Sequence, residues 1–414
     1  MKIEGIRKAF KTLGPGLITG ASDDDPSGIA TYSQAGAGFG LSTLWTALFT
    51  FPLMAAMQGM CARIGLVTSQ GLTATLKQYY PKPILYGMLL FSFPAITLNI
   101  GANIQAMGAV CHMILPAVPV SVFCVAITLL LMVVIIHYPY QKIAMILKWL
   151  CISLLLYIIV PFLSDQNWKL IARDTFIPVI RYDKEFFSII VAILGTTISP
   201  YLFYWQANME AEDRLHNHII VVDKKILNSM KADVNTGMLF SNVVMFFIIL
   251  TTGTVLFPAG IRQIDTVDQA ARALQPLAGN LTYLIFAAGI LGTGLLAVPV
   301  LAGAQSYMLA ETLGWEEGLD KKFAQAKPFY ISIIISLLVG LLLQFSAVSP
   351  LRALLYTAIA YGLTAPVLIA VVLHIGNNKK IMKSNTNSWF SNLLGAIALI
   401  IMTAAAIALI YFLL

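Results

Sequence analysis

Eleven apolar stretches of about 20 residues or more dominate this chain of 414 residues. A helix of about 20 apolar residues crosses the hydrocarbon core of a bilayer. The chain is 58% apolar and only 11% charged, and it departs from soluble domains in both respects. The sequence therefore predicts an all-α polytopic membrane protein with eleven transmembrane helices, at 12–39, 42–66, 83–112, 117–137, 143–163, 186–208, 236–257, 280–310, 328–346, 351–375 and 391–412.

The 26 lysines and arginines form short clusters between these stretches. Cytoplasmic loops of membrane proteins are enriched in basic residues. If the N-terminus is cytoplasmic, 19 of them fall on the inner side and 7 on the outer side. This bias predicts a multi-pass protein of the plasma (cytoplasmic) membrane with its N-terminus inside and its C-terminus outside. It explains the net charge of +7 as an orientation signal in a lipid bilayer and not as a nucleic-acid-binding face.

Two of the predicted spans contain a similar interruption. The first carries GASDDDPSGIATY at 20–32, and the sixth carries LGTTISPYLFYW at 194–205. In each, a glycine and a short polar run precede an X-Pro step, after which the apolar pattern resumes. Proline removes an intrahelical hydrogen bond and disfavours helix at the residue before it, so both helices are predicted to be broken.

The two interrupted spans begin two halves of five spans each. An odd number of spans per half inverts the second half, so 12–163 and 186–375 are predicted to be inverted repeats, with 391–412 as an additional helix. No soluble domain fits between the spans, and 1–414 is predicted to be a single transmembrane transporter domain. Interrupted segments at matching positions of two halves point to a transporter binding site.

Asp23, Asp24 and Asp25 make the first interruption chemically unusual. Only about 16 Å of helix precedes them in the span, which places them near the middle of the membrane. A carboxylate at that depth costs several kcal/mol and is expected to be functional. The first span has no basic residue after Lys11, and the sixth has none, so a bound cation is the expected counter-charge. Carboxylate, hydroxyl and carbonyl oxygens suit Mg²⁺, Ca²⁺ or Mn²⁺.

The segment GPGLITGASDDDPSG resembles the first-span signature of the natural resistance-associated macrophage protein (NRAMP) family of divalent-metal transporters. That family has Asp-Pro-Gly-Asn in its first span and Met-Pro-His in its sixth. The matching steps here are Asp25-Pro26-Ser27-Gly28 and Ser199-Pro200-Tyr201, and the eighth-span segment GILGTGLLAVPVLAGAQ is also similar. The resemblance implies a leucine-transporter-like (APC-type) fold of 5+5 inverted repeats with broken helices 1 and 6. It also implies a transporter without a cofactor, and not an enzyme.

The resemblance implies a metal site in which some of the family's ligands are replaced by other residues. Asp25 keeps the family's metal carboxylate, and the backbone carbonyl of Thr196 matches another family ligand. The family's Asn falls on Gly28 and its Met on Ser199, and Ser199 and Asp24 are predicted as further ligands. Loss of a thioether removes discrimination against hard ions, and the small residues widen the site. A wide, acidic, all-oxygen site suits Mg²⁺, which keeps several waters when bound.

The family's proton route has changed as well. Its sixth-span histidines fall on Tyr201 and Gln206, and its third-span Asp and Glu fall on Asn99 and Ala102. A relay needs groups that titrate. The sequence therefore predicts Mg²⁺ import by alternating access without obligatory proton coupling, similar to the NRAMP-related magnesium transporters. The residues predicted to line the ion pathway or to surround the ligands are Asp23, Ser22, Gly28, Asn99, Tyr201 and Gln206.

Several alternatives remain open. The nearest is a proton-coupled Mn²⁺/Fe²⁺ transporter of the same family, and others are a carrier of amino acids or organic ions and a channel. An intramembrane aspartyl protease needs two aspartates on facing helices, whereas the sixth span has none. No obligate protein partner is evident from the sequence.

Some polar and sulfur-containing residues receive structural interpretations. The four cysteines lie in apolar segments without metal-ligand spacing and are expected to be packing thiols. Asn103 and Gln105 are expected to make helix–helix hydrogen bonds, and Thr357 is not placed by its spacing. The segment 209–235, which contains Glu210 and a His-x-His pair, is interpreted as a solvated amphipathic linker.

Overall fold

The computed structural model describes residues 14–139, 142, 154, 156–163, 166–216, 221–279, 282–345 and 348–413. All regular secondary structure in these ranges is helical, which agrees with the predicted all-α class. Nine helical stretches of the described chain are long and apolar enough to cross a membrane. They are α4 (Trp45–Thr68), α6 (Lys82–Ile114), α7 (Val120–His137), α11 (Lys184–Thr197) continued by α12 (Pro200–His216), α13 (Lys224–Val255), α16 (Thr282–Leu313), α17 (Lys327–Leu341) with η6 (Leu342–Phe345), α18 (Pro350–Asn377) and α20 (Trp389–Leu413).

The other two predicted spans are not among these nine. The first divides into α2 (Pro15–Asp23) and α3 (Pro26–Phe39), each too short to cross a membrane alone. The fifth, 143–163, lies mostly outside the described residues. A total of eleven spans therefore stays a prediction. The short helices between the long ones are η1 (Gly40–Thr43), α5 (Leu72–Tyr79), α9 (Leu156–Ile159), η3 (Val160–Phe162), α10 (Trp168–Phe176), α14 (Val267–Ala271), η4 (Arg272–Leu274), α15 (Gln275–Ala278) and α19 (Lys379–Met382).

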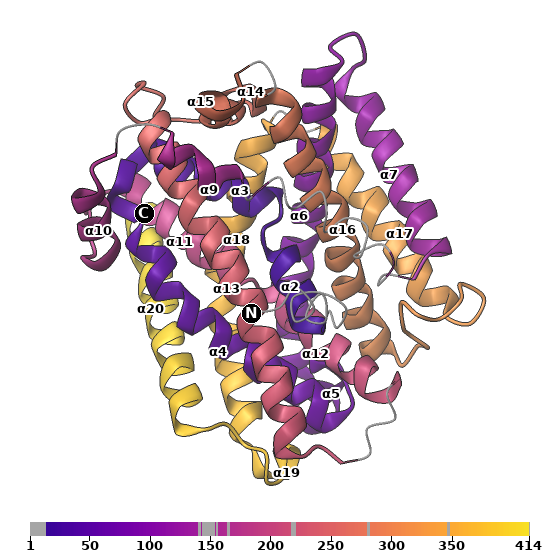
Figure 1. Ribbon diagram of the computed structural model, residues 1–414. Helices are drawn as coiled ribbons and strands as arrows, with labels where there is room; N and C mark the ends of the chain where they lie inside the picture. Colours follow the sequence, from indigo (N-terminus) through magenta and orange to yellow (C-terminus); the bar gives the residue numbers. More distant parts are fainter. Residues whose placement is uncertain are drawn as a thin grey trace, which may run out of the picture.

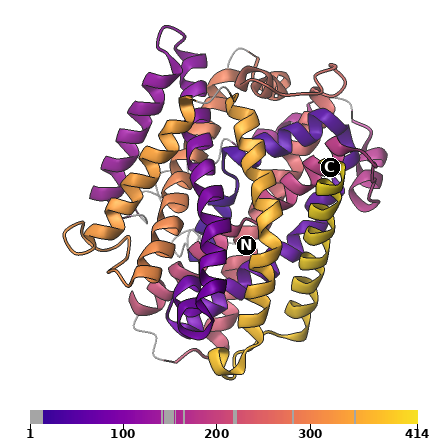
Figure 2. The same ribbon diagram turned by 180° about the vertical axis from the view of Figure 1, so that it is seen from behind.

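The long helices differ in how far the protein itself covers them. Helices α7 and α17 lie on one flank of the molecule and α20 on the opposite flank (Figures 1 and 2). The most apolar window of α11–α12 is 89% buried, whereas that of α7 is 28% buried and that of α20 is 33% buried. Exposed side chains on α7 include Leu129, Leu130 and Val133, which suit contact with lipid. In the first broken span, α3 is also buried along most of its length, so both broken helices lie among the covered elements.

One part of the predicted linker is instead ordered helix. Helix α12 continues to His216, and Glu210 on it is only 4% exposed and accepts a hydrogen bond from Gln206. Helix α13 begins at Lys224, inside the same segment. The interpretation of 209–235 as a solvated linker was therefore wrong for these residues, because the polar side chains find buried partners within and between helices.

Helices α2 and α13 cross at unusually short range. A Cβ atom added to Gly20 would lie 2.2 Å from the carbonyl oxygen of Gly237, and one added to Gly237 would lie 2.1 Å from that of Gly16. Only glycine permits two helix backbones to approach so closely. At the start of α2, the amide of Gly16 donates to the Asp233 carboxylate of α13 over 2.7 Å. The crossing fixes α2 against α13 between Gly16 and Gly20.

Candidate metal-binding site

Asp25 lies at the break of the first predicted span. Helix α2 ends at Asp23, and α3 begins at Pro26, whose missing N–H costs nothing at the first position of a helix. Asp25 is the N-cap of α3, and its Oδ1 accepts a hydrogen bond of 2.8 Å from the amide of Gly28. Its side chain is 2% exposed. The sequence predicted this break from the X-Pro step. It predicted a carboxylate near the middle of the membrane from the length of helix that precedes it.

Two asparagines of α6 hold the other oxygen of this carboxylate. Asn99 and Asn103 are four residues apart on one helix face, and their Nδ2 atoms donate to Asp25 Oδ2 over 3.0 and 3.1 Å. Thr357 of α18 donates to Asn99 Oδ1 over 3.2 Å. Asn99 was predicted to line the ion pathway or to surround the metal ligands, and its contact with Asp25 agrees with that position.

Asn103 was missed as a site residue. Besides its contact with Asp25, it has a buried Oδ1 atom that accepts no hydrogen bond from any residue that the structure describes. An amide oxygen in this position is a neutral oxygen donor of the kind that hard metal ions accept. The spacing of four residues between Asn99 and Asn103 was the signal that could have found it.

The second break brings another set of oxygen atoms to the site. Helix α11 ends at Thr197 and α12 begins at Pro200. The Ser199 hydroxyl lies 2.5 Å from the carbonyl oxygen of Thr196 and 3.1 Å from that of Gly195, and it donates to them. The hydroxyl and the freed carbonyl, both predicted as metal ligands, are thus within hydrogen-bond distance of each other.

The two breaks lie against each other. The hydroxyl of Tyr201 on α12 donates to the carbonyl oxygen of Ser22 near the end of α2, over 3.1 Å. A Cβ atom added to Gly28 would lie 3.5 Å from Thr196 Oγ1 and 3.3 Å from the Asp23 carbonyl oxygen. The structure therefore brings Asp25, Gly28, Thr196, Tyr201 and Ser22 together from the two interrupted helices.

Asp23 and Asp24 point to a different neighbour. The Ser241 hydroxyl of α13 lies 2.8 Å from Asp23 Oδ2 and 3.1 Å from Asp24 Oδ1. Both aspartates are 1% exposed. Asp24, predicted as a ligand of the same ion as Asp25, thus shares a partner with Asp23 on another helix. Gln206, predicted for the pathway, donates to Glu210.

No basic side chain neutralises these acids in the described part of the chain. The four ion pairs found there involve other residues. The described residues also contain no group of three or more His, Cys, Asp or Glu side chains that could hold one metal ion. A metal ion at Asp25 would therefore be held by this carboxylate together with neutral oxygen atoms and water.

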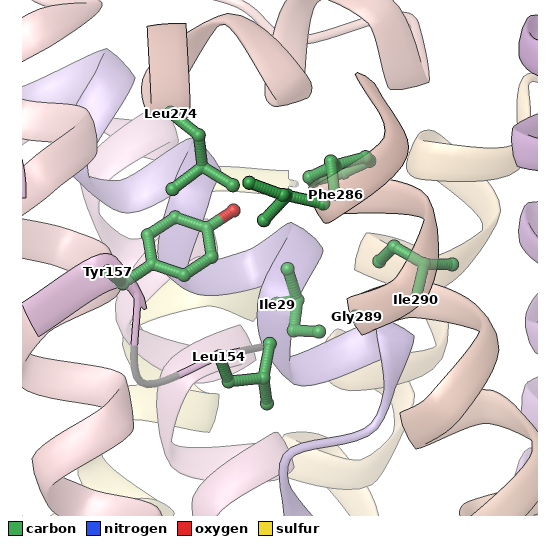
Figure 3. Close-up of a pocket in the computed structure, with 8 residues that line it drawn as sticks. Ile29, Leu154, Tyr157, Leu274, Phe286, Gly289 and Ile290 are labelled. Atoms are coloured by element: carbon green, nitrogen blue, oxygen red, sulfur yellow. The ribbon is translucent and has the colours of Figure 1, made fainter. Parts of the chain in front are cut away.

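An apolar pocket lies beyond the break along α3. Ile29, one helical turn after Asp25, lines it (Figure 3). The Tyr157 hydroxyl is buried there and has no hydrogen-bond partner within the described ranges. The described residues that line this pocket offer one hydroxyl and otherwise apolar side chains, so they do not form a cation site comparable to that at Asp25. Its other lining residues are Leu154, Leu274, Ile285, Phe286, Gly289 and Ile290.

We expect Asn103→Ala to lower the apparent metal affinity about 10- to 100-fold, because residues that orient a ligand typically contribute that much. The substitution removes one donor to Asp25 and one free oxygen. The measurement is the metal concentration at half-maximal uptake in proteoliposomes. Gln105→Ala on the same helix is the control, since Gln105 donates to the Val348 carbonyl instead. An unchanged affinity in Asn103→Ala would remove Asn103 from the site.

Comparison with known proteins gives similarities over nearly the whole chain. Residues 16–412 match the family model described as natural resistance-associated macrophage protein-like. The chain is 25% identical to the divalent metal cation transporter MntH of Clostridium acetobutylicum, over 98% of this chain and 92% of that protein. It is 22% identical to the protein of the same name from Bacillus subtilis, over 97% of this chain and 92% of that protein.

Solved structures show the same fold. The manganese transporter of Eremococcus coleocola, in complex with an aromatic bis-isothiourea substituted compound, superposes with a TM-score of 0.75 at 16% identity, over 98% of this chain and 87% of that one. Mhp1, a nucleobase-cation-symport-1 family transporter, superposes with a TM-score of 0.57 at 13% identity, over 96% of this chain and 93% of that one. These superpositions confirm the predicted leucine-transporter-like fold.

Proposed function

Because this chain belongs to the natural resistance-associated macrophage protein family, we propose that it carries a divalent metal cation across the membrane by alternating access. The cation binds at Asp25, between the two broken helices. The protein acts in this role as a multi-pass protein of the plasma membrane, with its N-terminus on the cytoplasmic side. The inverted repeats 12–163 and 186–375 supply the two halves that alternate.

The observation that carries this proposal is the Asp25 carboxylate, which is buried at the break of a helix and has no basic partner among the residues that the structure describes. Its hydrogen-bond donors are all neutral amides, so they orient the carboxylate but leave its charge uncompensated. The free Oδ1 atom of Asn103, the Ser199 hydroxyl and the Thr196 carbonyl add neutral oxygen atoms nearby. A divalent cation with some of its waters satisfies both the charge and the coordination of such a group.

Two candidate ions have separate support. The names of the relatives, a manganese transporter and divalent metal cation transporters, favour the Mn²⁺ alternative over the Mg²⁺ prediction. The oxygen-only donors favour Mg²⁺ as the second candidate, since Ser199 carries no sulfur. Both ions accept carboxylate, carbonyl and water ligands. For inward transport, the membrane potential supplies about 4.6 kcal/mol per divalent ion at 100 mV.

The test is uptake of Mg²⁺ and Mn²⁺ into proteoliposomes that contain a pH-sensitive dye. We expect saturable uptake of at least one of the two ions. Uptake of Mg²⁺ without acidification of the lumen supports the uncoupled magnesium transporter. Uptake of Mn²⁺ alone with acidification supports the proton-coupled alternative. Transport of neither ion contradicts the proposal, and a rate that rises linearly with concentration indicates a channel.

The role of Ser199 in ion choice is tested by Ser199→Met. We expect this variant to raise the uptake of Cd²⁺ relative to that of Mg²⁺, because thioether sulfur binds soft ions and not hard ones. The measurement is competition between the two ions in the same proteoliposomes. Ser199→Leu has a similar side-chain volume without sulfur and should leave the ratio unchanged. Equal ratios in both variants would place Ser199 outside the reach of the ion.

A further inference from the structure

A ring of hydrogen bonds connects the Asp25 site to helix α18. The hydroxyl of Ser27, two residues after Asp25, donates to the backbone carbonyl of Leu354 on α18 over 3.0 Å. One turn later on α18, the Thr357 hydroxyl donates to Asn99 Oδ1 over 3.2 Å, and Asn99 Nδ2 donates to Asp25 over 3.0 Å. The ring therefore joins α3, α18 and α6, and it begins and ends beside the same carboxylate.

The Thr357 hydroxyl has two acceptors within reach but only one proton. Besides Asn99 Oδ1, the carbonyl oxygen of Leu354 lies 2.7 Å from it, and a threonine inside a helix often donates to such a carbonyl of its own helix. Ser27 donates to the same carbonyl, and its hydroxyl lies 3.4 Å from that of Thr357. Because Ser27 satisfies the Leu354 carbonyl, the proton of Thr357 is left for Asn99.

This proton decides which way the side-chain amide of Asn99 faces. An amide has an oxygen that accepts and a nitrogen that donates. With Oδ1 held by Thr357, Nδ2 points to Asp25 Oδ2. The opposite orientation would place an amide oxygen against a carboxylate oxygen, and neither has a proton to share. Ser27, Asn99 and Thr357 are at most 3% exposed, so water competes little for these bonds.

Asn103 alone is not enough to hold the amide of Asn99. Its Nδ2 lies 3.1 Å from Asn99 Oδ1, but it also lies 3.1 Å from Asp25 Oδ2 and 2.9 Å from the backbone carbonyl of Asn99. An amide nitrogen has two protons for these three acceptors. The hydroxyl of Thr357 therefore supplies a donor that the asparagine pair lacks.

The second broken span holds α18 beside this ring. A Cβ atom added to Gly195 of α11 would lie 2.1 Å from the carbonyl oxygen of Ala358 on α18. The backbones of the two helices therefore touch next to Thr357. Gly195 directly precedes Thr196, whose carbonyl belongs to the proposed metal site. Thr357 thus has a defined position relative to oxygen atoms from both breaks.

We propose that Ser27 and Thr357 are positioning residues of the metal site. This inference rests on the proposed transport function. Ser27 directs the proton of Thr357, and Thr357 directs the amide of Asn99 toward the carboxylate, so neither acts by contact with the ion. The affinity of Asp25 for the ion then depends on the contact of α18 with α3 and α6.

The first test is Thr357→Val, which keeps the branched shape of the side chain and removes its proton. The measurement is uptake of Mn²⁺ and Mg²⁺ into proteoliposomes. For each ion that the wild type transports, we expect the concentration at half-maximal uptake to rise about fivefold, the effect of one hydrogen bond between neutral groups. The maximal rate should stay close to that of the wild type. Thr357→Ser restores the hydroxyl and should restore the wild-type concentration.

Thr364→Val is the matched control on the same helix. Its hydroxyl donates to carbonyls of its own helix, those of Ala360 and Tyr361, so its loss should leave the half-maximal concentration unchanged.

Ser27→Ala tests the order of the two residues. Without the Ser27 hydroxyl, the proton of Thr357 turns to the closer carbonyl of Leu354, so this variant should also raise the half-maximal concentration. In the Thr357→Val background the same change should add no further rise, because Ser27 acts through Thr357. Equal rises in both backgrounds contradict this order.

An unchanged half-maximal concentration in Thr357→Val overturns the proposal, as does a fall in the maximal rate alone, which indicates a purely structural role. If Thr357→Val fails to fold, the half-maximal concentration of Ser27→Ala decides in the same way. The proposed transport function fails separately, if wild-type proteoliposomes take up neither ion.

Discussion

Asp25→Asn should abolish divalent-metal uptake, with a loss of at least about 100-fold, since even residues that only orient a metal ligand contribute 10- to 100-fold. The substitution removes the charge that attracts the ion. It also turns an amide group toward Asn99 and Asn103, whose Nδ2 atoms donate to this position. The measurement is initial uptake of Mg²⁺ and Mn²⁺ in proteoliposomes.

The same variant should still fold. Asparagine is as good an N-cap as aspartate, and its amide oxygen can accept from the Gly28 amide. Its elution in size-exclusion chromatography and its midpoint of thermal unfolding should therefore stay close to those of the wild type. The control Asp174→Asn, which replaces a buried aspartate of α10 that pairs with Arg173, should transport normally. Wild-type uptake by Asp25→Asn would remove Asp25 from the transport site.

Gly20→Ala should strongly destabilise the folded protein. Its methyl group would lie 2.2 Å from the Gly237 carbonyl oxygen, and neither backbone can yield without separating α2 from α13. Overpacking typically costs 1–3 kcal/mol, and with a backbone atom on the opposite side we expect about 3 kcal/mol or more. The expected result is a lower yield of folded protein and a lower midpoint of thermal unfolding in detergent.

Gly59→Ala is the matched control for this prediction. Gly59 lies inside α4, and a Cβ atom there would meet nothing within 4 Å. Alanine has a higher helix propensity than glycine, so this variant should be as stable as the wild type or more stable, by up to about 1 kcal/mol. Equal midpoints for Gly20→Ala and Gly59→Ala would contradict the close crossing of α2 and α13.

Much of the fold follows from local rules of the sequence. The apolar stretches locate the long helices because a membrane span has a minimum length, and the X-Pro steps at Pro26 and Pro200 locate both breaks. The extension of α12 to His216 escaped prediction, because its polar residues resemble those of a loop until their buried partners are known. Most of the fifth span, including Cys151, lies outside the described residues.

The sequence predicted only those site residues whose type is unusual inside an apolar stretch. Asp25 stands out because a carboxylate inside an apolar stretch is costly. Asn103 and Ser241 are ordinary polar residues of long helices, and only the packing of α6 and α13 against the broken first span brings them to the aspartates. Contacts between residues 78 to 218 positions apart depend on the tertiary fold and leave no local pattern.

The close crossing of α2 and α13 also has a mechanical consequence. Helix α13 holds α3 just as closely, because a Cβ atom added to Gly36 of α3 would lie 2.4 Å from the carbonyl oxygen of Ile249 on α13. Asp24, with a φ of −80° and a ψ of 48°, joins α2 to α3 and is part of neither helix. Both halves of the broken first span are therefore packed against one long helix. If α2 tilts during transport, it takes α13 with it, and α3 has to follow.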